Sequence, residues 1–125
     1  MSLFSYNSYH KIITAIILMG WVILHFSKRD EIQDHFDNGQ VKLISSVENG
    51  KNEGKWIWYY ESGKKKMEGT FLNGKRQGTW ITWDRNGNKL TEGIYENDML
   101  NGEYIKWSPD GQIVERLYYV NDKLK

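Results

Sequence analysis

The sequence predicts a mainly β protein in which hairpin repeats form an antiparallel meander, preceded by one N-terminal transmembrane helix. Two observations lead to this prediction: residues 40–125 repeat with a period of 24 residues, and residues 12–26 form an apolar run. The composition suits strands joined by tight turns, because the 125 residues include six Trp, eight Tyr and twelve Gly but a single Pro.

The repeat comprises three full copies and one partial copy, at residues 40–63, 64–87, 88–111 and 112–125. Such self-similarity indicates one supersecondary unit stacked on itself. Every full copy ends in glycine, and each copy contains a turn signal: Asn49-Gly50, Asn73-Gly74, Asn97-Asp98 and Asn121-Asp122. These pairs supply the positive φ angles of tight hairpins. The intervening runs have strand length, so we expect seven strands.

The register of the hairpins follows from the length of the turn. A four-residue loop from Asn73 to Arg76 places glycines opposite aromatic rings, which would cover backbone otherwise exposed to water. A two-residue loop would break these matches. The predicted structural pairs are Gly69 with Trp80, Phe71 with Gly78, Gly93 with Tyr104, and Tyr95 with Gly102.

The apolar run predicts an uncleaved single-pass helix over residues 12–27, after a tail at residues 1–11. A helix over residues 12–26 would span roughly 22 Å, so flanking Tyr, Trp and Lys side chains would complete the crossing. A cleaved signal peptide and a buried core helix remain alternatives. The positive charges on the two sides nearly balance, and the short tail favours a repeat domain on the extracytoplasmic side.

Residues 28–39 read as a stalk or linker. Ile32 and Phe36 are four residues apart, so a helix leaving the membrane would carry one apolar stripe, and Asn38-Gly39 would end it.

Composition and motifs disfavour several functions. The chain has no cysteine and a formal net charge of +1, which gives no reason to expect thiolate chemistry or nucleic-acid binding. No nucleophile elbow or phosphate loop is present, and the three histidines are far apart in sequence. We therefore expect no enzymatic activity, no cofactor and no metal.

The repeat resembles the MORN repeat, and is most similar to the bacterial variant found in the YwqK-like antitoxin family. The resemblance covers residues 40–125 and is carried by the segments 68–87, 92–97 and 101–107, which read EGTFLNGKRQGTWITWDRNG, EGIYEN and NGEYIKW. It implies an elongated, single-layer, twisted sheet that mediates protein association or membrane contact.

Strand alternation predicts two faces. One carries Trp56, Trp58, Trp80 and Tyr104. The other has no second layer to cover it and supplies the candidate partner-binding residues Tyr59, Ile81, Trp83, Ile105 and Trp107. The cluster Lys64, Lys65 and Lys66 is a candidate site for anionic lipid or an acidic partner, although strand alternation and the nearby Glu61 and Glu68 favour a solvated strand edge.

These features predict a membrane-anchored protein-interaction or scaffold module, for example an accessory subunit of a membrane complex. The first alternative is an antitoxin that neutralises a toxin protein by direct binding. The second is a sheet that binds lipid headgroups. Neither the partner nor the oligomeric state follows from the sequence.

Overall fold

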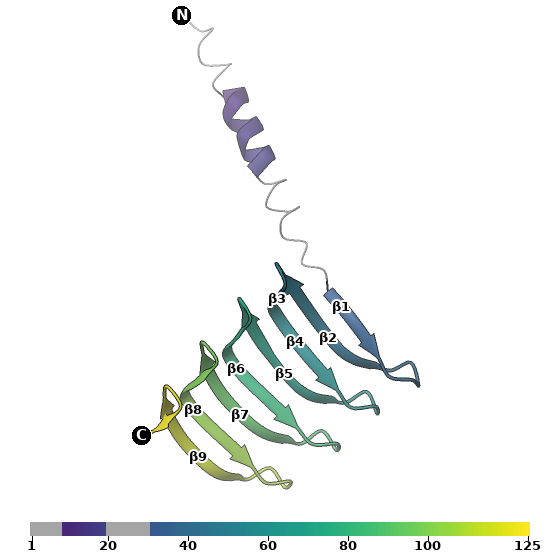
Figure 1. Cartoon of the computed structure of the whole chain (residues 1–125), viewed down its shortest axis with the longest axis vertical. Coiled ribbons are helices and arrows are strands. Elements are labelled where there is room, and N and C mark those ends of the chain that lie inside the picture. The colour runs from purple at the N-terminus through teal and green to yellow at the C-terminus, as the bar shows by residue number, and fades with distance from the viewer. Residues whose placement is uncertain (1–8, 20–30) are drawn as a thin grey trace, which may run out of the picture.

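The repeats form one antiparallel sheet in a computed structural model, which describes residues 9–19 and 31–125. Figure 1 shows the strands side by side in a single curved layer. Nine strands follow the order of the sequence across the sheet, and β3 pairs with β2 beside this path. The strands are β1 (Glu31–His35), β2 (Val41–Glu48), β3 (Lys51–Asn52), β4 (Gly54–Tyr59), β5 (Lys65–Leu72), β6 (Lys75–Trp83), β7 (Lys89–Glu96), β8 (Met99–Trp107), β9 (Ile113–Val120) and β10 (Lys123–Leu124).

The predicted stalk at residues 28–39 is wrong from Glu31 onward. Strand β1 pairs with β2, and residues 36–40 form a loop closed by the Phe36 amide on the Gln40 carbonyl, at 2.8 Å. The same bond recurs from Tyr60 to Lys64, from Asp84 to Asn88 and from Ser108 to Gln112. The 24-residue period therefore begins in the segment that we expected to be helical, because pairing with β2 satisfies its backbone groups.

The N-terminal segment is described only in part. Residues 9–19 are helical, whereas residues 1–8 and 20–30 lie outside the described residues. The predicted tail and the predicted transmembrane helix over 12–27 both extend into those gaps. Within the described ranges, no helix has the length and apolar character needed to cross a membrane.

The turn inside each hairpin has two residues, not the predicted four. Leu72 pairs with Lys75 across Asn73 and Gly74, whose φ angles are 52° and 83°. Two positive φ angles define the turn whose twist suits a hairpin. Consequently Phe71 faces Arg76 instead of Gly78, and in the next copy Tyr95 faces Leu100 instead of Gly102.

A bulge in the second strand of each hairpin then restores the predicted register. Thr70 pairs with Gln77, and the next pair is Glu68 with Ile81, so one residue of β5 between these pairs opposes three residues of β6. Gly78 lies in this bulge with a φ of 75°, and the matching Gly54 and Gly102 have φ angles of 73° and 138°. Beyond the bulge Gly93 pairs with Tyr104, as predicted. Gly69 and Trp80 fall inside the bulge and are not paired with each other in the register, but the Trp80 ring lies against Gly69, so the predicted contact between ring and glycine is present.

Neighbouring turns are also joined to each other. The Gly74 amide donates to the Asn52 carbonyl at 2.8 Å, and the Asp122 amide donates to the Leu100 carbonyl at 2.9 Å. Between them the Asp98 amide reaches the Arg76 carbonyl at 3.1 Å. One edge of the sheet is therefore a ladder of turns, and the other edge carries the loops that begin at Phe36, Tyr60, Asp84 and Ser108.

Candidate functional site

One face of the sheet is a layer of packed rings. Trp80 is its centre and is only 7% exposed. The ring centroids of Phe71 and Trp58 lie 5.0 and 5.9 Å from that of Trp80, and Tyr95 follows at 6.2 Å. Trp56 packs on Trp58 and Phe71. Residues 31–125 form a single sheet without a second layer, so this ring face takes the place of a core.

The ring face is hollowed between its rings. A depression of about 270 Å³ is bounded by Trp58, Trp80 and Tyr104, among others. Thr82 and Thr91 line it as well, and their hydroxyls share a hydrogen bond of 2.6 Å. Burial raises the pKa of Tyr104. The depression is thus mostly apolar, with a few hydroxyl groups and one charged side chain, Arg76, whose Cζ lies 4.1 Å from the Tyr95 ring centroid; this mixture is the usual character of a recognition site.

The opposite face carries the five predicted partner-binding residues. Ile57, Ile81 and Ile105 lie in one row across the sheet, where they alternate with Glu68 and Glu92. The neighbouring row places Tyr59 opposite Lys65, Trp83 opposite Lys89, and Trp107 opposite Ile113. The structure therefore brings the predicted residues together, but with charged groups between them.

We call this side of the sheet, which carries Trp83 and Trp107, the charged face, because lysines cover both tryptophans. Lys65 Nζ lies 5.7 Å from the Trp83 ring centroid and 2.7 Å from a Glu68 carboxylate oxygen. One repeat on, Lys89 Nζ lies 4.9 Å from the Trp107 ring and 2.7 Å from Glu92.

The charges around Glu68 also set its protonation. Desolvation alone would raise the pKa of Glu68, but the hydrogen bond from Lys65 and the charges of Lys55 and Lys65 lower it overall. The rings of the charged face are therefore covered by a network of paired charges.

The three clustered lysines separate in the fold. Lys64 Nζ donates to the Asn86 carbonyl at 2.8 Å, and Lys65 pairs with Glu68. Lys66 Nζ instead lies 5.8 Å from the centroid of the Tyr60 ring. The lysines therefore do not form one cationic patch, because strand alternation and the loop direct them to different partners.

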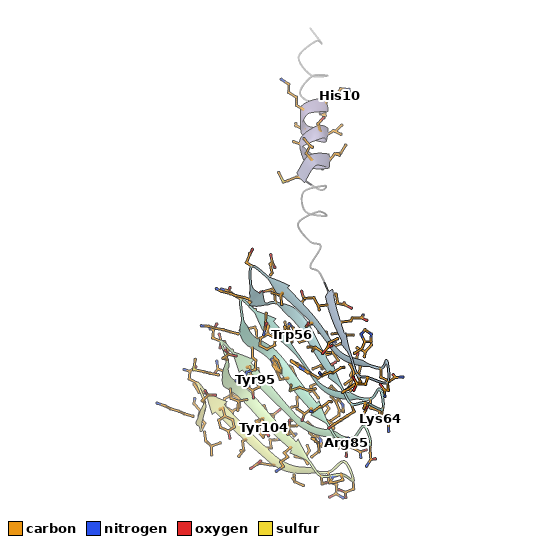
Figure 2. All side chains as sticks on the ribbon, turned by 45° about the vertical axis from the view of Figure 1, so that its right-hand side comes forward. His10, Trp56, Lys64, Arg85, Tyr95 and Tyr104 are labelled. Carbon is orange, nitrogen blue, oxygen red and sulfur yellow. The ribbon has the colours of Figure 1, made fainter. Side chains whose placement is uncertain are left out.

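A second hollow, which was not predicted from the sequence, lies at the loop edge. It has a volume of about 180 Å³, and Tyr60 forms one wall beside Lys66 and Arg85. In Figure 2, Lys64 and Arg85 lie at the loop edge, whereas Trp56, Tyr95 and Tyr104 lie on the body of the sheet. The 24-residue spacing of Phe36, Tyr60 and Asp84 was the available signal, since it aligns neighbouring loops. In the described part of the chain, no cluster of His, Cys, Asp or Glu could hold a metal ion.

The comparisons with known proteins support a repeat family. The family model described as the MORN repeat variant matches residues 52–73, 76–97 and 100–121, together more than half of the chain. The second of these units runs from β6 through the Asp84 loop to the end of β7, so its borders lie at the turn ladder. A search of curated proteins finds no match. The chain therefore belongs to the MORN repeat family, in its variant form.

Proposed function

We propose that this chain is a membrane-anchored protein-interaction module whose sheet docks a partner protein through its ring face. The observation behind this proposal is the hollow of about 270 Å³ among the rings. Trp58, Trp80 and Tyr104 offer a partner apolar surface in a concave setting, and the hydroxyls of Thr82 and Thr91 offer polar contacts. Aromatic anchors in a concave site typically dominate the binding energy of protein interfaces.

The charged face is a weaker docking surface in this proposal. A partner placed over Trp83 would have to displace Lys65 or desolvate it together with Glu68. Trp107, Lys89 and Glu92 pose the same obstacle. Taking paired charges out of water costs free energy, and the hollow of the ring face has a single charged side chain in its lining, Arg76, which is paired with Asp98.

The anchor in this proposal is the segment 12–27. Its described portion is apolar on all sides: Ile12, Ile13, Ile16, Ile17, Leu18 and Met19 are each at least half exposed. Apolar surface of this kind needs a covering medium or partner, and a bilayer supplies one. Glu31 starts β1 beside Ser46, so the anchor would join the sheet at the turn edge.

Affinity capture of the detergent-solubilised full-length chain from its native membrane tests the proposal. Thr91→Glu places a charge in the hollow, and Ile94→Glu adds the same charge to the opposite face of the same strand, where Ile94 is 40% exposed. We expect the captured partner to be lost with Thr91→Glu and retained with Ile94→Glu.

Two other results would overturn parts of the proposal. Loss of the partner with Trp83→Ala and Trp107→Ala, but not with Thr91→Glu, would move the docking surface to the charged face. Recovery of the chain alone, from membranes in which it is fully expressed, would contradict a docking role. Recovery of the chain in the soluble fraction would contradict the anchor.

A further inference from the structure

The hollow at the loop edge brings two cations, one from a strand and one from the next loop, onto one ring. Lys66 Nζ lies 5.8 Å and Arg85 Cζ lies 5.3 Å from the centroid of the Tyr60 ring. Lys66 is in β5, whereas Arg85 belongs to the next loop along the edge. Phe36, Tyr59 and Glu61 complete the lining.

The ring between these cations is held in place. The Tyr60 hydroxyl donates to the Trp83 carbonyl at 2.8 Å, and its amide donates to the Lys64 carbonyl at 2.8 Å. Lys64 in turn ties its loop to the next one through the Asn86 carbonyl. Both neighbouring loops are therefore fixed relative to the hollow before any ligand arrives, which lowers the entropic cost of binding.

The two cations lack a counterion within the described residues. No carboxylate lies within 4.0 Å of Lys66 or Arg85 there, although Glu61 lies in the same lining. Asp84, which precedes Arg85 in the same loop, accepts hydrogen bonds from the Asn88 and Asn86 amides, which lower its pKa and keep it within that loop. Two like charges on one ring repel each other, so an anion between them would be favourable.

We propose that this hollow binds an anionic side chain presented by an acidic peptide segment. Lys66 and Arg85 would pair with the anion, and the aromatic walls from Phe36, Tyr59 and Tyr60 would contact the apolar part of the same side chain. The volume of about 180 Å³ suits one side chain, not a larger surface.

The position of the hollow favours a protein over a membrane. The chain enters β1 at the turn edge, where Glu31 pairs with Ser46, and the loops lie at the other end of the strands. Strand β2 has eight residues, so the two edges are roughly 26 Å apart. This choice of partner rests on the anchor of the proposed function, whereas the anion site does not.

Fluorescence anisotropy of a fluorescein-labelled hexaglutamate peptide, titrated with the full-length chain in detergent, tests the site. We expect binding that weakens with added salt and is absent for a hexaglutamine peptide. Lys66→Gln combined with Arg85→Gln should weaken binding about 30-fold, because two exposed charge pairs at the upper end of their usual worth contribute roughly a fivefold factor each. Lys51→Gln with Lys75→Gln removes the same charge at the turn edge and should leave binding unchanged.

Three results would overturn the proposal. Equal losses in the two double variants would show attraction to overall charge only. If hexaglutamate does not bind at low salt to a chain whose near-ultraviolet circular dichroism spectrum shows that it is folded, the anion site is ruled out. Binding to phosphatidylserine vesicles that depends on Lys66 and Arg85, without binding to hexaglutamate, would assign the hollow to lipid. Each result is independent of Thr91→Glu, so failure here is distinguishable from failure of the ring-face proposal.

Discussion

Replacing Gly69 with alanine tests how tightly the ring layer is packed onto the sheet. A Cβ atom at this position would lie 2.1 Å from Cδ2, 2.3 Å from Cε2 and 2.6 Å from Cε3 of Trp80. Carbon atoms in contact are normally about 3.5 Å or more apart, so the indole would have to retreat by more than 1 Å. Phe71 and Tyr95 pack against the indole and limit that movement.

The expected cost comes from this displacement. An extra methyl group in a packed site typically costs about 1–3 kcal/mol, and here the obstacle is a restrained ring instead of a flexible chain end. We therefore expect Gly69→Ala to lower the free energy of unfolding by about 3 kcal/mol. Gly93 is the matched control in the next copy, because its nearest neighbours are Leu100 Cδ2 at 3.0 Å and Tyr104 Cδ2 at 3.2 Å. Those side chains can shift, so Gly93→Ala should cost about 1 kcal/mol or less.

Urea denaturation followed by tryptophan fluorescence and circular dichroism measures both variants. Equal costs for Gly69→Ala and Gly93→Ala would refute the reasoning. A double-mutant cycle adds a second criterion: in a Trp80→Leu background the ring is gone, so Gly69→Ala should cost close to nothing. An unchanged cost in that background would mean that the alanine acts on the backbone and not on the indole.

Further predictions concern hydrogen bonding, pH, the bulge and local stability. Tyr60→Phe removes the 2.8 Å bond to the Trp83 carbonyl and should cost about 1 kcal/mol in the same denaturation assay. The pKa of Glu68 is below its ordinary value of 4.5, so the ionised carboxylate stabilises the fold above that pH, and this stabilisation is lost as pH falls through the folded-state pKa. In the Glu68→Gln variant, the free energy of unfolding should therefore fall less steeply at acidic pH than in the wild type, as measured by denaturation over a pH series. Gly78 has a φ of 75° and open space around it, so Gly78→Ala should cost about 1–2 kcal/mol through the backbone alone, and Gly78→Asn should cost less. Amide hydrogen exchange should be slowest in β6 and β7 and fastest in β1, whose residues are all exposed.

The sequence predicted the repeat and most of the strands because both depend on local patterns. The period, the turn residues and the contacts of Gly69 with Trp80 and Gly93 with Tyr104 follow from which residues recur. The turn length was wrong because we explained the register by one device, whereas the chain uses two. A two-residue turn and a bulge at Gly78 give the same pairing beyond the bulge as a four-residue turn.

The site was harder to predict because it depends on contacts between copies. The sequence shows Trp83, but only the fold shows that Lys65 lies over it. Lys66 and Arg85 are 19 positions apart, and their convergence on Tyr60 depends on how adjacent loops stack. The first strand was missed because the segment EIQDH has no Trp, Tyr or Phe and a single β-branched residue, Ile32, whereas a later strand such as β6 is rich in both.

The ladder of turns has a consequence for how such a sheet can change over evolutionary time. Each turn amide bonds to the strand that starts at the adjacent turn, as Asp98 does with Arg76 of β6, so a duplication of exactly 24 residues would preserve every such contact. Each duplication adds two strands and lengthens the sheet by roughly 10 Å. Insertion of a single residue would instead move Trp80 off its glycine. Gene duplication can therefore change the length of the sheet, and with it the surface offered to a partner, in fixed steps of one repeat.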